Sequence, residues 1–90
     1  MKISDKKKEK ISEQILAVLY SNNPKPLFTY KIAQEIARDE EFVKQLLLEL
    51  KKRKLVLEIK KNPKGVVYIR RIRWKLTDQT YEIYKKHQNT

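Results

Sequence analysis

The sequence predicts an α+β domain in which a three-helix core is followed by a two-stranded β-hairpin and a C-terminal helix. Apolar residues recur at helical spacing through the first 54 positions, alternate with polar residues as in strands after that, and return to helical spacing near the C-terminus. Ninety residues suffice for one such domain with one core, so 1–90 is expected to be a single unit. Residues 1–6 precede the first periodic segment and are expected to be flexible.

The first helix is expected from about residue 7 to residue 22, because four apolar residues recur at the spacing of one helical face. These residues are Ile11, Ile15, Val18 and Leu19. Two prolines, Pro24 and Pro26, follow at once. Proline cannot continue the helical hydrogen-bond ladder and biases its predecessor toward an extended backbone, so the helix is expected to end before them.

Two helices separated by only two or three residues are expected next, which is the pattern of a helix-turn-helix. Thr29 is expected to cap the first of them, which carries Ile32, Ala33 and Ile36 on one face. Asp39 is expected to cap the second, which runs to about residue 54. The predicted buried stripe of that helix is Phe42, Val43, Leu46, Leu47 and Leu50.

The pattern after residue 54 is that of two strands joined by a tight turn. In 55–60, one face is expected to be buried and to carry Leu55, Leu57 and Ile59, with Val56, Glu58 and Lys60 on the other face. Residues 62–65 read Asn-Pro-Lys-Gly, which suits a type I turn closed by a bulge at the glycine. The returning strand, 66–76, is expected to place Tyr68, Arg70, Ile72, Trp74 and Leu76 on one face and Ile69, Arg71, Arg73 and Lys75 on the other.

A last helix is expected from a cap at Thr77 to about residue 86. Within it, Tyr81 and either Tyr84 or Ile83 are expected to return to the core or to face a partner. Stacking of Phe42, Tyr68 and Trp74 on a single strand of nucleic acid is an alternative use of the other aromatic side chains. We favour core positions for these three because they share faces with aliphatic residues.

The net charge of +11 is concentrated in one segment. Basic residues exceed acidic ones by one in 1–50 and by ten in 51–76, and the two balance in 77–90. Such a concentration is typical of a surface that binds phosphates. A solubilising surface, or the Lys and Glu enrichment of a heat-adapted protein, is the alternative, but that enrichment normally adds acids along with bases.

Eleven residues are candidates for DNA contact. Lys44 and Gln45 are expected to read base edges if the third helix enters the major groove, because lysine reaches guanine acceptors and glutamine pairs with adenine. Thr29, Tyr30 and Lys31 are placed for phosphate contacts, which position a protein without reading sequence. The hairpin supplies a basic cluster suited to a narrow minor groove or its flanking phosphates. Its members are Lys60, Lys61, Lys64, Arg70, Arg71 and Arg73.

Three acids, Asp39, Glu40 and Glu41, open the third helix. Acids in a first turn complement the helix dipole by about 0.3–1 kcal/mol, which is a purely structural reason for their presence. Near phosphates they repel, although a carboxylate can also accept from a cytosine amino group. Whether the start of this helix enters the major groove is therefore left open.

In order and spacing, these elements resemble the winged helix-turn-helix DNA-binding superfamily, particularly small archaeal and bacterial MarR-like regulators, over about residues 10–85. The matching segments are 32–37 (IAQEIA), 42–50 (FVKQLLLEL), 54–56 (KLV) and 74–79 (WKLTDQ). Lys54 and Thr80 stand where glycine is frequent in such proteins. The resemblance implies double-stranded DNA as the partner and a homodimer formed through the terminal helices that reads a two-fold-related site.

Several function classes find no support in the sequence. There is no glycine-rich phosphate loop and no Ser, His and Asp set, and with one histidine, His87, and no cysteine we expect no catalytic residues, metal site, cofactor or disulfide. No apolar run approaches the roughly 20 residues of a membrane span, and because no apolar stretch follows the lysines near the N-terminus we expect that this segment is not a signal peptide. A cytoplasmic, nucleoid-associated protein is expected, with no membrane partner and no evident small-molecule ligand.

The sequence therefore predicts a double-stranded DNA-binding transcription regulator that uses a recognition helix at about 39–54 and a basic wing at about 55–76. A protein-interaction winged helix in a transcription, replication or membrane-remodelling assembly is one alternative, which the acidic start of the recognition helix and an exposed Leu48 favour. An architectural or RNA-binding protein that works mainly by charge is another.

Overall fold

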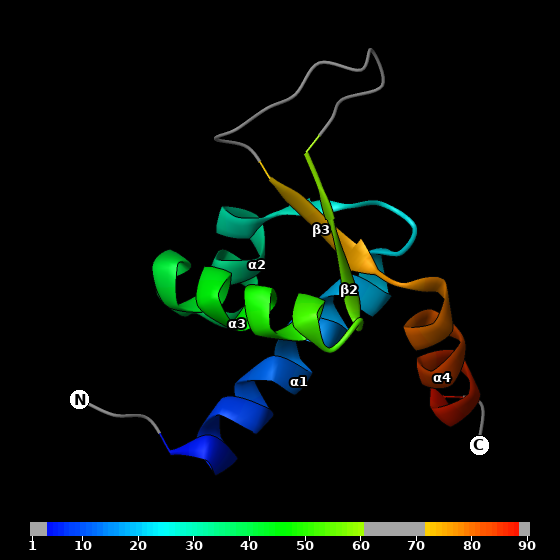
Figure 1. Cartoon of the computed structure of the whole chain (residues 1–90), viewed down its shortest axis with the longest axis horizontal. Coiled ribbons are helices and arrows are strands. Elements are labelled where there is room, and N and C mark those ends of the chain that lie inside the picture. Colours follow the sequence, from blue (N-terminus) through cyan, green and yellow to red (C-terminus); the bar gives the residue numbers. More distant parts are fainter. Residues whose placement is uncertain (1–3, 61–71, 89–90) are drawn as a thin grey trace.

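A computed structural model describes residues 4–60 and 72–88 (Figure 1). Its elements are α1 (Asp5–Asn22), β1 (Leu27–Phe28), α2 (Thr29–Ile36), α3 (Glu40–Lys52), β2 (Val56–Ile59), β3 (Arg73–Leu76) and α4 (Asp78–Gln88). The predicted α+β class, with three helices, an antiparallel strand pair and a last helix, is confirmed. The predicted turn at 62–65 and the candidate residues Lys61, Lys64, Arg70 and Arg71 lie outside the described residues.

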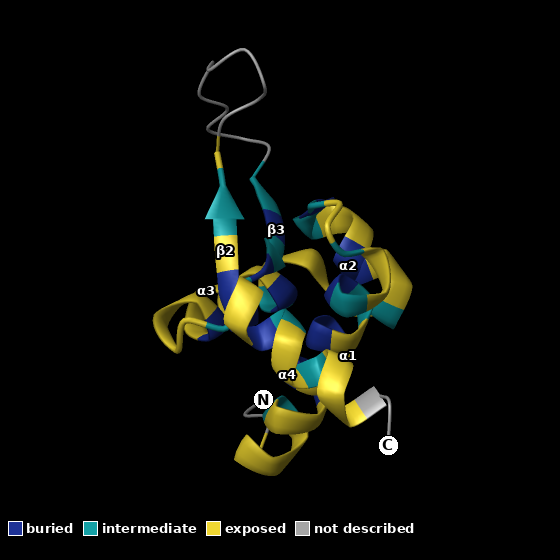
Figure 2. Ribbon diagram, turned by 90° about the vertical axis from the view of Figure 1, so that its right-hand side faces the viewer, coloured by how far each residue is buried: buried dark blue, intermediate teal, exposed yellow. Residues whose placement is uncertain are grey.

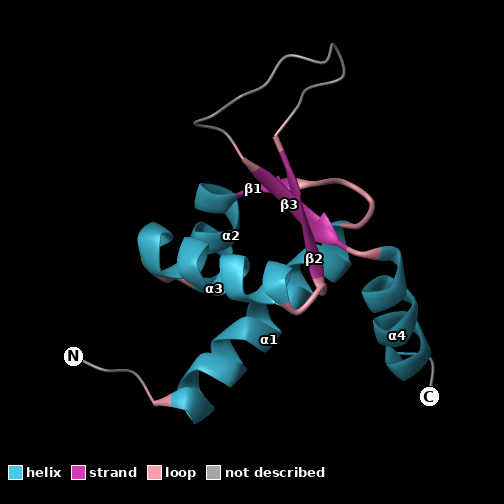
Figure 3. Ribbon diagram, viewed as in Figure 1, coloured by secondary structure: helices cyan, strands magenta, loops and turns pink. Residues whose placement is uncertain are grey.

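The sheet contains one strand that the sequence did not predict. Its order is β1-β3-β2, so β1 and β2 flank β3, and both pairs are antiparallel (Figure 3). In β1, Leu27 pairs with Trp74 and Phe28 pairs with Arg73. A two-residue strand is too short to produce a visible alternation, so the expected two-stranded hairpin is extended here to a three-stranded sheet.

The first helix begins earlier than predicted. Ser4 caps it by accepting a hydrogen bond from the Lys7 amide at 3.3 Å, so 4–6, which we expected to be flexible, form the cap and the first helical residues. Ile11, Ile15 and Leu19 are buried as predicted, and Val18 packs partly against them.

The helix-turn-helix is confirmed, and its turn depends on Ala37. This residue adopts a left-handed conformation with φ of 55°, and its amide donates back to carbonyls of α2, so the chain can leave one helix and enter the next. The Asp39 carboxylate accepts from the Phe42 amide at 3.0 Å, which confirms the predicted cap of α3. The stripe of α3 faces inward, with Phe42 partly buried and Val43, Leu46, Leu47 and Leu50 fully buried.

The predicted cap at Thr29 is wrong. Phe28 occupies the cap position of α2 without a side-chain hydrogen bond, and Thr29 is the first residue of the helix. The reason is that β1 continues directly into α2, so the cap position belongs to the strand. The Thr29 hydroxyl instead accepts a hydrogen bond from the Trp74 indole N–H at 2.8 Å, which ties the start of α2 to the central strand.

The predicted buried face of β2 is also wrong. Val56 is 1% exposed, whereas Leu57, which we expected inside, is 47% exposed. Val56 pairs with Leu76 across the sheet, and partners in an antiparallel ladder project to the same side. Because the face of β3 that carries Trp74 and Leu76 is buried, Val56 is drawn into the core with it.

The core fills the space between the three N-terminal helices and one face of the sheet (Figure 2). Its buried apolar residues are Ile11, Ile15, Leu16, Leu19, Leu27, Ile32, Ala33, Val43, Leu46, Leu47, Leu50, Val56, Trp74 and Leu76. Trp74 is fully buried, which confirms its core position and removes it from any stacking platform. The central strand therefore anchors the helix-turn-helix to the sheet.

The last helix is capped as predicted, because the Thr77 hydroxyl accepts from the Thr80 amide at 3.2 Å. The ring of Tyr20 lies 5.4 Å from the ring of Tyr81 and 5.7 Å from that of Tyr84. These two tyrosines thus return to the body of the domain, while Ile83 stays 49% exposed. Burial and the nearby charge of Glu13 raise the pKa of the Tyr84 hydroxyl.

Lys54 follows α3 with φ of 62°, a conformation that glycine adopts without the steric cost of a Cβ. We therefore expect Lys54→Gly to raise the free energy of unfolding by about 0.5–1 kcal/mol. Chemical denaturation followed by circular dichroism measures this. Lys44→Gly is the matched control: it makes the same change at an exposed position in the interior of α3 and should lower stability by about 0.5–1 kcal/mol. Equal losses in both variants would contradict the prediction.

Candidate nucleic-acid interface

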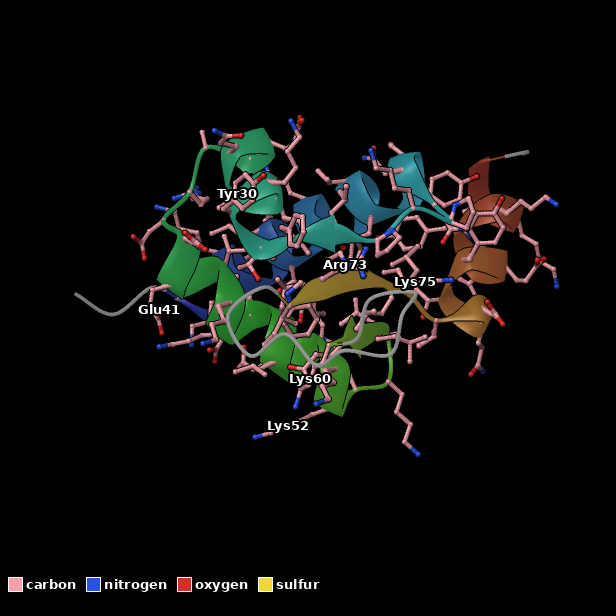
Figure 4. The ribbon with its side chains drawn as sticks, turned by 90° about the horizontal axis from the view of Figure 1, so that it is seen from above. Tyr30, Glu41, Lys52, Lys60, Arg73 and Lys75 are labelled. Carbon is pink, nitrogen blue, oxygen red and sulfur yellow. The ribbon has the colours of Figure 1, made fainter. Side chains whose placement is uncertain are left out.

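The described candidate residues come from three places: the start of α2, the outer face of α3, and the ends of β2 and β3 from which the chain leads to 61–71. Figure 4, seen from the side toward which β2 points, shows Tyr30, Lys60 and Arg73 together with Glu41 and Lys52 at opposite ends of α3. We call the surface formed by the start of α2, the outer face of α3 and the ends of β2 and β3 at Lys60 and Arg73 the wing-side surface.

The outer face of α3 carries the predicted base-reading residues. Lys44 and Gln45 are exposed, and so are Lys51 and Lys52 in the last turn. Leu48, which lies between these two pairs, is 37% exposed. Burial of the opposite stripe forces these positions outward, as the periodicity predicts. One edge of this exposed face, at Lys51, adjoins β2 through Glu58. The other edge, with Gln45, Leu48 and Lys52, shares a hollow with Lys8 of α1.

Charge on α3 is divided between its ends. Glu40 and Glu41 are exposed in its first turn, while Lys51 and Lys52 occupy its last turn (Figure 4). This arrangement complements the helix dipole at both ends. It also means that an approaching phosphate is attracted to the C-terminal end of α3, beside the sheet, and repelled at the N-terminal end.

At the start of α2, the positive charge of Lys31 is partly neutralised by a nearby acid, so it is less available to a phosphate than the sequence suggests. The Lys31 ammonium lies 3.6 Å from the Glu35 carboxylate, and both side chains are about half exposed. The Thr29 hydroxyl is engaged as an acceptor by Trp74 but retains its own proton for donation. Tyr30 is 53% exposed and is the most accessible of the three.

Phe28 connects two of the candidates and was not singled out from the sequence. Its ring is stacked with that of Tyr30 at 5.8 Å between centroids, and the Arg73 guanidinium lies over it at 5.9 Å. A cation over an aromatic face is stabilised by about 0.5–1 kcal/mol at an exposed site. The β1–β3 pairing thus places Arg73 of the wing beside Tyr30 of the helix-turn-helix.

Glu58 is the second residue that sequence reasoning missed. Its side chain is 7% exposed, and one of its oxygens accepts from Lys51 at 3.1 Å and from Lys60 at 3.2 Å. Burial alone raises the pKa of this carboxyl, but the hydrogen bonds and charges of the two lysines outweigh burial and hold the pKa below its usual value. The carboxylate is therefore ionised at neutral pH and joins α3 to the base of the wing.

Other kinds of site are not indicated in the part of the chain that the structure describes. Over 4–60 and 72–88, no group of three or more His, Cys, Asp or Glu side chains is arranged to hold a metal. Among the described helices, none has both the length and the apolar character needed to cross a membrane. An open hollow of about 420 Å³ lies between α1 and α3. Its lining is mostly charged: Asp5, Lys8, Glu9, Ser12, Glu49, Leu50, Lys52 and Arg53.

No protein-family model and no curated protein sequence matches the chain. Solved structures do resemble it. The Staphylococcus aureus MepR–DNA complex superposes with a TM-score of 0.73 and 22% identity, covering 88% of this chain and 60% of that one. A second structure is MepR, a transcription regulator of the S. aureus multidrug efflux pump MepA. It superposes with a TM-score of 0.69 and 23% identity, covering 88% of this chain and 54% of that one.

A third similar structure is the E41A mutant of Lactococcus lactis ZitR, with a TM-score of 0.70 and 21% identity over 99% of this chain and 56% of that one. The chain thus spans between 54% and 60% of the length of these three proteins. At such identities the likeness concerns the backbone arrangement, and it agrees with the order of helices and strands described above. This chain has the winged helix-turn-helix fold that its sequence predicts.

Proposed function

We propose that this protein binds double-stranded DNA through the wing-side surface and regulates transcription by occupying a promoter. The observation that carries the proposal is the excess of ten basic residues in 51–76, the segment that includes the end of α3, β2 and β3 of a winged helix-turn-helix fold. A protein of similar fold, MepR, has been solved in a complex with DNA. A basic surface on such a fold supplies the salt-dependent attraction on which DNA binding rests.

In this proposal, the wing and the C-terminal end of α3 contact phosphates, and Lys44 and Gln45 read base edges. The other members of the basic cluster predicted in the hairpin contribute further phosphate contacts: Lys61, Lys64, Arg70 and Arg71. The acids at the start of α3 disfavour deep insertion of that end, so we expect α3 to enter the major groove with its lysine-rich end closest to the backbone.

We further propose a homodimer formed through α1 and α4, so that two recognition helices address a two-fold-related site. The exposed Ile83 of α4 and the tyrosine cluster that joins α4 to α1 support this choice of surface. We also propose that the protein is not an enzyme and acts in the cytoplasm on nucleoid DNA.

Fluorescence anisotropy with labelled DNA tests the function. Random duplexes and duplexes from upstream of genes are titrated over a salt series, with single-stranded DNA and RNA for comparison. Six phosphate contacts would give a slope of log affinity against log salt of about −5. We expect such a slope and tighter binding to at least one upstream duplex.

Other outcomes point to the alternatives. No binding at about 150 mM salt, a roughly physiological strength, would overturn the proposal and favour a protein-interaction module. Equal binding to random duplexes, upstream duplexes and RNA would favour an architectural nucleic-acid binder that works by charge.

A further inference from the structure

Glu58 is the sole acidic residue in 51–76, and it occupies the junction between the recognition helix and the wing. Its Oε1 atom accepts from both Lys51 of α3 and Lys60 at the end of β2. The carboxylate is shielded, with its side chain 7% exposed, whereas the two lysine side chains are 46% and 55% exposed. The negative charge thus lies beneath the surface and the positive charges lie on it.

The two ammonium groups are close to each other because both contact the same oxygen atom, at 3.1 and 3.2 Å. Each ammonium has three N–H donors, and contact with Glu58 occupies one of them. The remaining donors are available to a ligand at the surface. An anion with several oxygens, such as a phosphate, can therefore bridge both lysines while Glu58 remains in place.

We propose that Lys51 and Lys60 form a phosphate-binding site at the junction of α3 and the wing, and that Glu58 is a positioning residue that holds them together and limits their attraction for non-specific DNA. This inference rests on the proposed function. The trio carries a net charge of +1, so it contributes about as much to counterion release as one basic residue, although it presents two.

Positioning matters because free lysine side chains lose much rotamer freedom on binding. Glu58 restricts both before DNA arrives, which favours one location for the phosphate. The cost is a weaker electrostatic attraction to any DNA. Glu58 therefore lowers the affinity for DNA of any sequence and fixes where the DNA phosphate backbone lies on the protein surface.

Glu58→Gln tests this, because the amide keeps the size and an accepting oxygen but removes the negative charge. With a random-sequence duplex, we expect the salt slope to steepen by about 0.9 and the affinity at 0.15 M salt to rise about fivefold. Glu82→Gln is the matched control: it makes the same charge change at an exposed position of α4, which lies away from the wing-side surface (Figure 1). We expect its slope to stay close to that of the wild type.

A slope unchanged in E58Q, or changed equally in E58Q and E82Q, would overturn the inference. Lys60→Gln supplies an independent test should E58Q prove unfolded by circular dichroism: it should flatten the slope by about 0.9, and an unchanged slope would refute the site. Absence of DNA binding by the wild-type protein would instead overturn the proposed function, so the two failures are distinguishable.

Discussion

Replacing Arg70, Arg71 and Arg73 together with alanine should weaken duplex binding at 0.15 M salt by about two orders of magnitude. Each lost phosphate contact removes about 0.9 from the log–log salt slope, so the slope should flatten by up to about 2.7. Arg73 lies at the base of the wing over Phe28, and the other two arginines precede it in the same basic cluster. The expected loss is large because the wing supplies most of the positive charge.

Anisotropy over a salt series measures this loss. The control is the triple alanine variant of Lys6, Lys7 and Lys10, which removes the same charge from the first turns of α1, far from the wing (Figure 1). It should change the slope by much less than the arginine variant. Similar slopes for the two triple variants would mean that net charge, and not the wing, determines binding.

Trp74→Ala should lower the free energy of unfolding by about 3–5 kcal/mol, the usual range for deleting a buried aromatic side chain. Trp74 is fully buried at the centre of the sheet, between Leu27 on β1 and Glu58 on β2. Its loss also leaves the Thr29 hydroxyl without the indole donor that ties α2 to β3. Against a typical domain stability of about 5–15 kcal/mol, this variant should be close to unfolding or unfolded.

Urea denaturation followed by circular dichroism measures the effect, since the variant lacks the single tryptophan as a fluorescence probe. Leu57→Ala is the control on the neighbouring strand, because Leu57 is 47% exposed and its truncation should cost less than about 1 kcal/mol. A Trp74 variant as stable as the Leu57 variant would show that the indole does not anchor the domain.

Local patterns predicted the helices well. The caps at Asp39 and Thr77 and the buried stripe of α3 were read directly from residue type and spacing. Residues that interact across the chain were not predictable in this way. Leu27 joins the sheet only through Trp74, and this pairing removed the cap from Thr29. The alternation of apolar and polar residues likewise cannot identify the inner face of a short strand that carries apolar residues on both faces. For this reason Val56 was predicted on the outer face of β2, although it is buried.

The candidate site divides in the same manner. Charge distribution pointed to the wing, and periodicity placed Lys44 and Gln45 on the outer face of α3. Phe28 and Glu58 were missed because each depends on a partner in another element. Phe28 contacts Arg73, which lies 45 residues away along the chain. Glu58 of β2 contacts Lys51 of α3. The one signal in the sequence that could have identified Glu58 is that it is the sole acid within a strongly basic segment.

The most direct test of the DNA-binding surface is a map of backbone amide shifts by two-dimensional nuclear magnetic resonance, recorded as a duplex is added to the labelled protein. We expect the perturbed amides to cluster at the start of α2, the outer face of α3 and the ends of β2 and β3, including Tyr30, Lys44 and Arg73. Perturbations confined to α1 and α4, or an unchanged spectrum at low salt, would contradict binding through the wing-side surface.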